Sequence, residues 1–275
     1  MRGFGIWKID EGIYDILDEG NSSFYIVEGD DRAAVIDTGV SPGQKILPLI
    51  RKYTSKPLIL VLTHAHIDHW YHMDEFETVY MCHREFEVGP DALRDMMADK
   101  ELHPERTLDI RTDTRIELGG TALSVCEVPG HTPGSVVVLD ERSNRLVTGD
   151  AIGSGYGVWM QTPTAVPLET YYESLVHLLK WLVDRGGRMT FHGGHRYQMF
   201  QSTHVPAFNP PSLGLLCDLI DLIDQIVHGK IVGRISNVDN IMELEPVLYA
   251  AYGRAEIQYK ASNIKKRPDA VSAKV

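Results

Sequence analysis

A dense group of His and Asp residues directly after an apolar run is the feature that limits the possible folds of this chain most strongly. The run Leu58–Leu62 is followed by His64, His66, Asp68 and His69. Side chains two positions apart share one face of an extended chain, so the first three are expected to point the same way off a strand end. Imidazole nitrogens and carboxylate oxygens are ligands that Zn, Fe and Mn accept, and crowding them without a partner is costly. The cluster therefore predicts a metal site.

Three later segments repeat one layout, a short apolar run followed by a Gly-bearing turn that carries a ligand-type residue. They place His131, Asp150 and either His192 or His195 in such turns. Each turn alone is weak evidence, because Gly-Asp and Gly-His turns are common. Their order after the first cluster indicates that the chain can complete a site that one loop could not saturate.

In this order the motifs resemble those of the metallo-β-lactamase superfamily of metallohydrolases, over roughly residues 20 to 200. The matching positions are Asp-Thr-Gly at 37–39, His-x-His-x-Asp-His at 64–69, and the turns at His131, Asp150 and His195. The resemblance implies a binuclear metal centre that holds two divalent ions. We expect both ions to be Zn, and Fe or Mn are the alternatives.

The resemblance also assigns the ligands. It implies that the first ion is bound by His64, His66 and His131, and the second ion by Asp68, His69 and His195. Asp150 would bridge the two ions. His195 is favoured over His192 because the family ligand directly follows a Gly, whereas His192 follows Phe191. Asp37 is expected to orient the first cluster from outside, as carboxylates do around ligating His. The alternative for Asp37 is an ordinary turn residue after a strand.

The chemistry implied is hydrolysis by a metal-bound hydroxide, without a Ser or Cys nucleophile. Two divalent ions can share a water and lower its pKa towards neutrality. A carboxylate beside that water can pass a proton to the leaving group, so Asp68 and Asp150 are the predicted catalytic residues.

Aromatic and Met-rich segments beside the ligands predict the substrate pocket. Tyr156 and Trp159 follow Asp150, and Tyr197 follows His195. Such a rim suits an uncharged or acyl substrate better than a phosphate, which favours Arg or Lys. We expect an ester, thioester or lactone as the substrate. Tyr156 would either donate a hydrogen bond to a developing oxyanion or only line the rim.

Two other reactions stay open on the same ligands. Iron-binding relatives of this family include single-iron sulfur dioxygenases, and their His and Asp ligands do not distinguish them from hydrolases. Phosphodiesterases are the second alternative. The diiron reductases of the family usually replace the second His of the first motif with Glu, and this chain keeps His66.

Composition and charge narrow the partners to a small-molecule substrate. The net charge of −11 argues against nucleic acid. No apolar run is long enough to span a bilayer, and the N-terminus has no apolar signal stretch, so no membrane contact is expected. Cys82, Cys126 and Cys217 are scattered without metal-type pairing and are expected to be reduced. These features predict a cytoplasmic protein.

Apolar periodicity and turn residues predict the order of elements. Strands are expected at 4–8, 13–17, 23–28, 33–37, 58–62, 114–119, 121–128, 135–140 and 144–148, and helices at 42–53, within 83–106, at 167–184 and at 212–228. Two β-rich halves with helices outside would give an α+β fold, a four-layer αβ/βα sandwich. The resemblance implies the same architecture, with the metals at one edge where the halves meet.

The last quarter of the chain is expected to be an extension of this domain. Residues 1–205 would form the metal-binding domain, and residues 206–275 would add a helix and a final strand at 252–259, packed on the same domain. The strongly apolar helix at 212–228 would pack in the core, contact a second copy in a homodimer, or cover the site as a lid.

Overall fold

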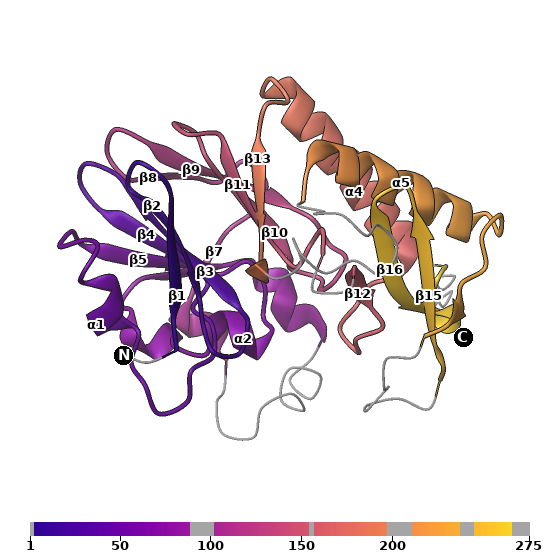
Figure 1. The fold of residues 1–275 in the computed structure, drawn as a ribbon, viewed down its shortest axis with the longest axis horizontal. Helices are drawn as coiled ribbons and strands as arrows, with labels where there is room; N and C mark the ends of the chain where they lie inside the picture. The colour runs from indigo at the N-terminus through magenta and orange to yellow at the C-terminus, as the bar shows by residue number, and fades with distance from the viewer. Residues whose placement is uncertain (1–2, 89–101, 154–156, 197–210, 237–244, 266–275) are drawn as a thin grey trace, which may run out of the picture.

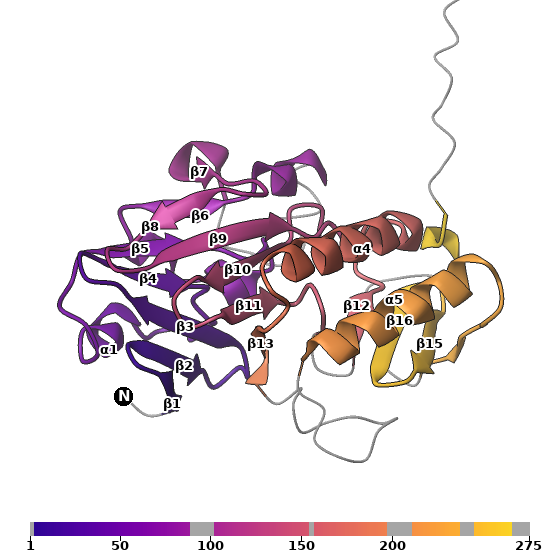
Figure 2. The same cartoon turned by 90° about the horizontal axis from the view of Figure 1, so that it is seen from above.

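The computed structural model describes residues 3–88, 102–153, 157–196, 211–236 and 245–265 (Figure 1). These residues form two facing β-sheets with helices on their outer sides, and a third, smaller sheet beside them (Figures 1 and 2). Within them, no helix is both long enough and apolar enough to cross a membrane.

The first sheet begins as an antiparallel meander and ends with parallel strands. In spatial order it contains β1 (Gly5–Asp10), β2 (Ile13–Leu17), β3 (Ser23–Glu28), β4 (Ala33–Ile36), β5 (Leu58–Val61), β6 (Val79–Met81) and β7 (Leu108–Asp109). The pairs from β1 to β4 are antiparallel, and those from β4 to β7 are parallel. Because β4 and β5 are parallel, the residues that follow them, including Asp37 and His64, leave the sheet at the same edge.

The second sheet faces the first. Its spatial order is β13 (Thr190–Gly193), β11 (Arg145–Gly149), β10 (Val136–Asp140), β9 (Ala122–Glu127) and β8 (Arg115–Glu117). Apolar side chains from both sheets form one buried cluster, with Val27 and Val61 from the first sheet and Val125 and Val138 from the second. This inter-sheet core fixes the two strand edges that carry the ligand turns relative to each other.

Helices cover the outer faces and complete the four layers. The first sheet is covered by α1 (Leu47–Ile50) and α2 (Ile67–Trp70), where Ile50 and Trp70 share a buried cluster with Val35. The second is covered by α4 (Leu168–Asp184), where Leu175 packs in one cluster with Leu139 and Phe191. Among the described residues, the remaining short helices are the 3₁₀ turns η1 (Met73–Glu75), η2 (His83–Val88), η3 (Pro104–Arg106) and η5 (Ala261–Asn263). The predicted α+β sandwich is confirmed.

The third sheet is a feature that the sequence analysis missed. It has the order β12 (Val158–Met160), β16 (Ala255–Lys260), β15 (Val247–Tyr252) and β14 (Arg234–Ile235). No strand was expected at residues 158–160, where β12 pairs in parallel with β16. Three residues are too few to show a strand period, and their pairing partner lies about a hundred residues away in sequence.

The C-terminal helix α5 (Leu213–Val227) begins at Ser212, whose side chain accepts a hydrogen bond from Leu215 N–H. Leu216, Leu219 and Ile223 are fully buried and belong to the same cluster as residues of α4 and β16. The described helix therefore packs in a core, as one of the three predictions stated. A homodimer contact, a lid and the boundary at residue 205 stay predictions.

One other helix prediction differs from the structure, and a second falls largely outside the described residues. The helix expected at 42–53 forms only as the four-residue α1, where Pro48 stands in the first turn and Glu75 accepts hydrogen bonds from Ile46 N–H and Leu47 N–H. Of the segment 83–106, the described parts form the 3₁₀ turns η2 and η3, and residues 89–101 lie outside the described residues.

Candidate metal centre

Four strand ends bring the predicted ligands to one edge of the sandwich. His64 and its neighbours follow β5, His131 follows β9, Asp150 follows β11, and His195 follows β13 (Figure 1). Backbone hydrogen bonds join the two sheets and neighbouring strand ends here: Val136 N–H donates to Thr63 O at 2.9 Å, and Gly194 N–H donates to Gly149 O at 2.9 Å. The ligand turns are thus held by main-chain bonds as well as by the core.

The first ligand group contains three buried imidazoles. One nitrogen from each of His64, His66 and His131 lies within 4.8 Å of the others. His66 Nδ1 and His131 Nε2 are 2.8 Å apart, and the rings of His64 and His131 are edge-on with centroids 5.1 Å apart. These are the three residues predicted for the first ion.

The second group contains Asp68, His69 and His195, with ligand atoms again within 4.8 Å of one another. Asp68 Oδ2 lies 3.4 Å from His69 Nε2 and 3.5 Å from His195 Nε2. These are the three residues predicted for the second ion.

Asp150 lies between the two groups. Its Oδ2 is 3.5 Å from His131 Nε2 and 3.3 Å from His195 Nε2, and its Oδ1 is 3.7 Å from His69 Nε2. One carboxylate therefore reaches a member of the first group and two members of the second. This is the position that a bridging ligand would occupy.

Backbone carbonyls set the tautomers of two of these imidazoles. His131 Nδ1 lies 2.7 Å from Trp159 O, and His195 Nδ1 lies 2.8 Å from Asn21 O. A carbonyl oxygen can only accept, so Nδ1 carries the proton in both rings. In the neutral ring, Nε2 then presents a lone pair to the centre.

Side chains hold the outer nitrogens of the other three imidazoles. His64 Nδ1 is 3.1 Å from Thr63 Oγ1, His66 Nε2 is 3.1 Å from Thr164 Oγ1, and His69 Nδ1 is 2.9 Å from Asp37 Oδ2. Each of the five rings is thus bonded on one nitrogen and turns the other towards the centre. Such outer bonds fix ring orientation at metal sites.

Asp37 makes the contacts that its predicted orienting role requires. The fully buried carboxylate accepts hydrogen bonds from Thr63 N–H and Thr63 Oγ1–H, both at 2.7 Å, besides its contact with His69. Its φ of 63° is a left-handed conformation that Asp and Asn tolerate better than most residues. Asp37 therefore links the end of β4 to the loop that carries the first cluster.

Burial keeps the first group uncharged. Burial, followed by the unfavourable electrostatic effect of a second imidazole at His131, lowers the pKa of His66 to about 3, and burial lowers the pKa of His64 and of His131. The second group differs, because Asp68 and the other carboxylates raise the pKa of His69 above its usual value although burial opposes them. The first group thus has neutral nitrogens near pH 7, the form that binds metal.

Unpartnered buried atoms give the fit test for metal ions. His64 Nε2, His69 Nε2 and Asp150 Oδ1 are buried without a hydrogen-bond partner. Leaving such atoms unsatisfied costs about 1–3 kcal/mol each, and more for charged groups. A divalent cation that accepts mixed nitrogen and oxygen ligands would satisfy all three, so the residues present fit such ions.

His192 belongs to neither of the two ligand groups. It is buried, its ring is 6.0 Å from that of Tyr25 and edge-on to it, and neither ring nitrogen has a hydrogen-bond partner. Burial, followed by the charges of Arg145 and Arg196, lowers its pKa to about 4. Strand alternation turns His192 towards the inter-sheet core, whereas His195 lies past the strand end and reaches the centre.

The predicted substrate-pocket residues are only partly described. Tyr156 and Tyr197 lie outside the described residues. Trp159 lies in β12, where its backbone carbonyl bonds His131 and its indole Nε1 is buried without a partner. Its contact with the centre is thus through the main chain.

Three supporting residues were missed by the sequence analysis. Ser22 Oγ donates to Asp68 Oδ2 at 2.8 Å, Asn21 supplies the carbonyl that bonds His195, and Thr164 bonds His66. None lies in a recognisable motif, and a backbone carbonyl has no sequence signal at all.

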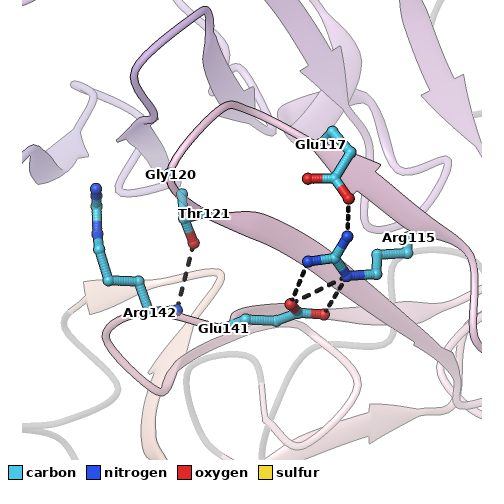
Figure 3. Close-up of a pocket in the computed structure, with 6 residues that line it drawn as sticks. All are labelled: Arg115, Glu117, Gly120, Thr121, Glu141 and Arg142. Atoms are coloured by element: carbon cyan, nitrogen blue, oxygen red, sulfur yellow. Dashed lines mark hydrogen bonds and ion pairs between the residues drawn. The ribbon is translucent and has the colours of Figure 1, made fainter.

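A separate hollow of about 340 Å³ is lined by residues of β8 and of the turns before β9 and after β10 (Figure 3). His131 follows the other end of β9. Arg115 lies between the carboxylates of Glu117 and Glu141 and pairs with both, and Arg142 N–H donates to Thr121 Oγ1 at 3.3 Å. The hollow contains none of the ligand residues, so it is not part of the candidate centre.

Known proteins are similar to this chain in sequence. The family described as the metallo-beta-lactamase superfamily matches residues 17–195. A curated relative, the acyl-coenzyme A thioesterase MBLAC2 of Bos taurus, is 28% identical over 218 residues, which cover 67% of this chain and 75% of the relative. The probable metallo-hydrolase YqgX of Bacillus subtilis is 26% identical over 206 residues, covering 69% of this chain and 93% of YqgX.

Solved structures share the fold. A metallo-beta-lactamase from Pontibacter korlensis aligns with a TM-score of 0.58 at 20% identity, covering 79% of this chain and 99% of that one. The protein TTHA1623 in a di-iron-bound form aligns with a TM-score of 0.53 at 24% identity, covering 71% of this chain and 92% of that one. The chain belongs to the metallo-beta-lactamase superfamily and is an enzyme of that metal-dependent, hydrolytic class.

Proposed function

We propose that this protein is a binuclear hydrolase of acyl thioesters, with esters and lactones as chemically related substrates. The observation that carries the binuclear assignment is the Asp150 carboxylate, which lies within 3.5 Å of His131 and His195. The thioester class is supported by the relatives named acyl-coenzyme A thioesterase, at 28% identity.

In this proposal, seven side chains hold two divalent ions, with Zn expected from the mixed nitrogen and oxygen ligands. His64, His66 and His131 would bind the first ion, and Asp68, His69 and His195 would bind the second. Asp150 would bind both ions. When bound, the ions would polarise the acyl carbonyl and lower the pKa of a shared water to near neutrality.

The two carboxylates of the centre differ in exposure, and this separates their proposed roles. The Asp68 side chain is 27% exposed, whereas that of Asp150 is 5% exposed. Asp68 is the more exposed of the two and is therefore better placed to pass a proton to a leaving group that departs towards solvent. Ser22 Oγ–H holds Asp68 Oδ2 in place, and Asp150 serves mainly to keep the two groups at a constant separation.

The test is a substrate screen on the full chain reconstituted separately with Zn, Mn and Fe(II). Acyl-coenzyme A thioesters, simple esters, lactones, phosphodiesters and β-lactams are offered, and oxygen consumption is recorded in parallel. We expect thioester hydrolysis to be fastest, and Asp68→Ala to reduce turnover by orders of magnitude. Activity confined to phosphodiesters, or substrate-dependent oxygen uptake by the Fe(II) form without hydrolysis, would contradict the proposal.

A further inference from the structure

We propose that Thr164 is a positioning residue that aims His66 Nδ1 into the first ligand group; this rests on the metal centre proposed above. Thr164 lies between β12 and α4, in no ligand motif, and is only 2% exposed. Its Oγ1 is 3.1 Å from His66 Nε2. It is the side chain that bonds the outer nitrogen of this imidazole.

The direction of the bond follows from what His66 must present inwards. His66 Nδ1 lies 2.8 Å from His131 Nε2, inside the group, so a ligating Nδ1 needs its lone pair there. The proton of the neutral ring then sits on Nε2, and this N–H donates a hydrogen bond to Thr164 Oγ1. Rotating the ring by half a turn would bury this N–H without an acceptor, so the hydroxyl opposes the misaligned orientation.

A second threonine extends this bond to another ligand. Thr164 Oγ1 is 3.3 Å from Thr162 Oγ1, and Thr162 Oγ1 donates to the backbone carbonyl of His131 at 3.4 Å. With His66 donating to Thr164, the hydroxyl protons run in one direction along this chain. Two of the three ligands of the first group are thereby connected outside the centre as well as inside it.

The position of Thr164 is itself held by the main chain. Ala165 N–H donates to Thr162 O at 3.1 Å, and Val166 N–H donates to Gly130 O at 2.9 Å, next to His131. From η5, the Asn263 side chain donates to Ala165 O at 2.9 Å and to Val166 O at 3.1 Å. Supporting side chains that are fixed in this way are those that can set ligand geometry. Asn263 lies beyond the family match at 17–195, so a residue outside the matched region helps to hold the segment that carries Thr164.

The experiment compares Thr164→Val, Thr164→Ser and Thr162→Val with the wild type, using Zn titration against a competing chelator. Val keeps the side-chain shape and removes the hydroxyl, whereas Ser keeps the hydroxyl. Thr190→Val, at an exposed position at the far end of β13, is the matched control. Imidazole ¹⁵N shifts of metal-free protein report the His66 tautomer.

We expect Thr164→Val to lower the affinity for one of the two ions by about 10–100-fold, the range found for outer partners of metal ligands. Thr164→Ser should stay within about threefold of the wild type, Thr162→Val should fall between them, and Thr190→Val should change nothing. Wild-type affinity in Thr164→Val, or equal losses in the Val and Ser variants, would overturn the positioning role. A wild-type protein that binds no metal would overturn the proposed centre as well, so the two failures are distinguishable.

Discussion

Asp37 Oδ2 lies 2.9 Å from His69 Nδ1, and both side chains are fully buried. The same carboxylate also accepts two hydrogen bonds from Thr63, so three donors converge on it. This arrangement links the ends of β4 and β5 to α2, and it turns the unpartnered His69 Nε2 towards Asp68 and Asp150.

Asp37→Asn is expected to lower the affinity for the second ion by about 10–100-fold, because the amide lacks the negative charge that supports His69. Asn tolerates the φ of 63° at this position, so little backbone strain is added. Metal titration measures the affinity, and circular dichroism checks the fold. An unchanged affinity for both ions would mean that Asp37 is only a turn residue.

Asp68→Ala should reduce the bound metal from two ions to about one, because the first group keeps all three imidazoles. Turnover should fall by at least about 100-fold, as a proton-transfer group contributes about 10²–10⁴ in rate. Elemental analysis and steady-state kinetics on one preparation test both parts. Ser22→Ala removes only the hydroxyl that bonds Asp68, so bound metal and turnover should both fall less than in Asp68→Ala.

His195→Ala and His192→Ala should have opposite effects on metal content. Removing His195 deletes a nitrogen that lies 3.3 Å from Asp150 and 3.5 Å from Asp68, so the second ion should be lost. Removing His192 deletes a ring that packs against Tyr25, so both ions should be retained. Loss of an ion from His192→Ala alone would reverse the assignment.

The metal-free protein should lose stability in mild acid through His192. Burial lowers the folded-state pKa of His192 to about 4, whereas an unfolded His titrates near about 6.5. The unfolded state therefore takes up the proton first, and stability falls as the pH drops from about 6.5 towards about 4. At pH 5 this amounts to roughly 2 kcal/mol. Urea unfolding with chelator at pH 7 and pH 5 should show that His192→Leu reduces this loss; an identical pH dependence would contradict it.

Local order along the chain was enough to predict the residues available to the centre and the class of fold. The histidines at 64, 66 and 69 and Asp68 lie within six residues, so one strand end presents them together whatever the rest of the chain does. The apolar runs before His131 and Asp150 place these residues at strand ends for the same local reason. The four layers follow from the same strand and helix periods, which are local properties of the chain.

The folded arrangement is needed to explain which of the two late histidines reaches the centre and what holds each ring. His131 is bonded by the carbonyl of Trp159, in a three-residue strand that exists because β16 pairs with it. Carbonyls are present in every residue and carry no sequence signal, and a hydroxyl such as that of Thr164 becomes a partner only when folding places it beside His66. The ligands were therefore readable from local order, whereas their supports arise from contacts between distant segments.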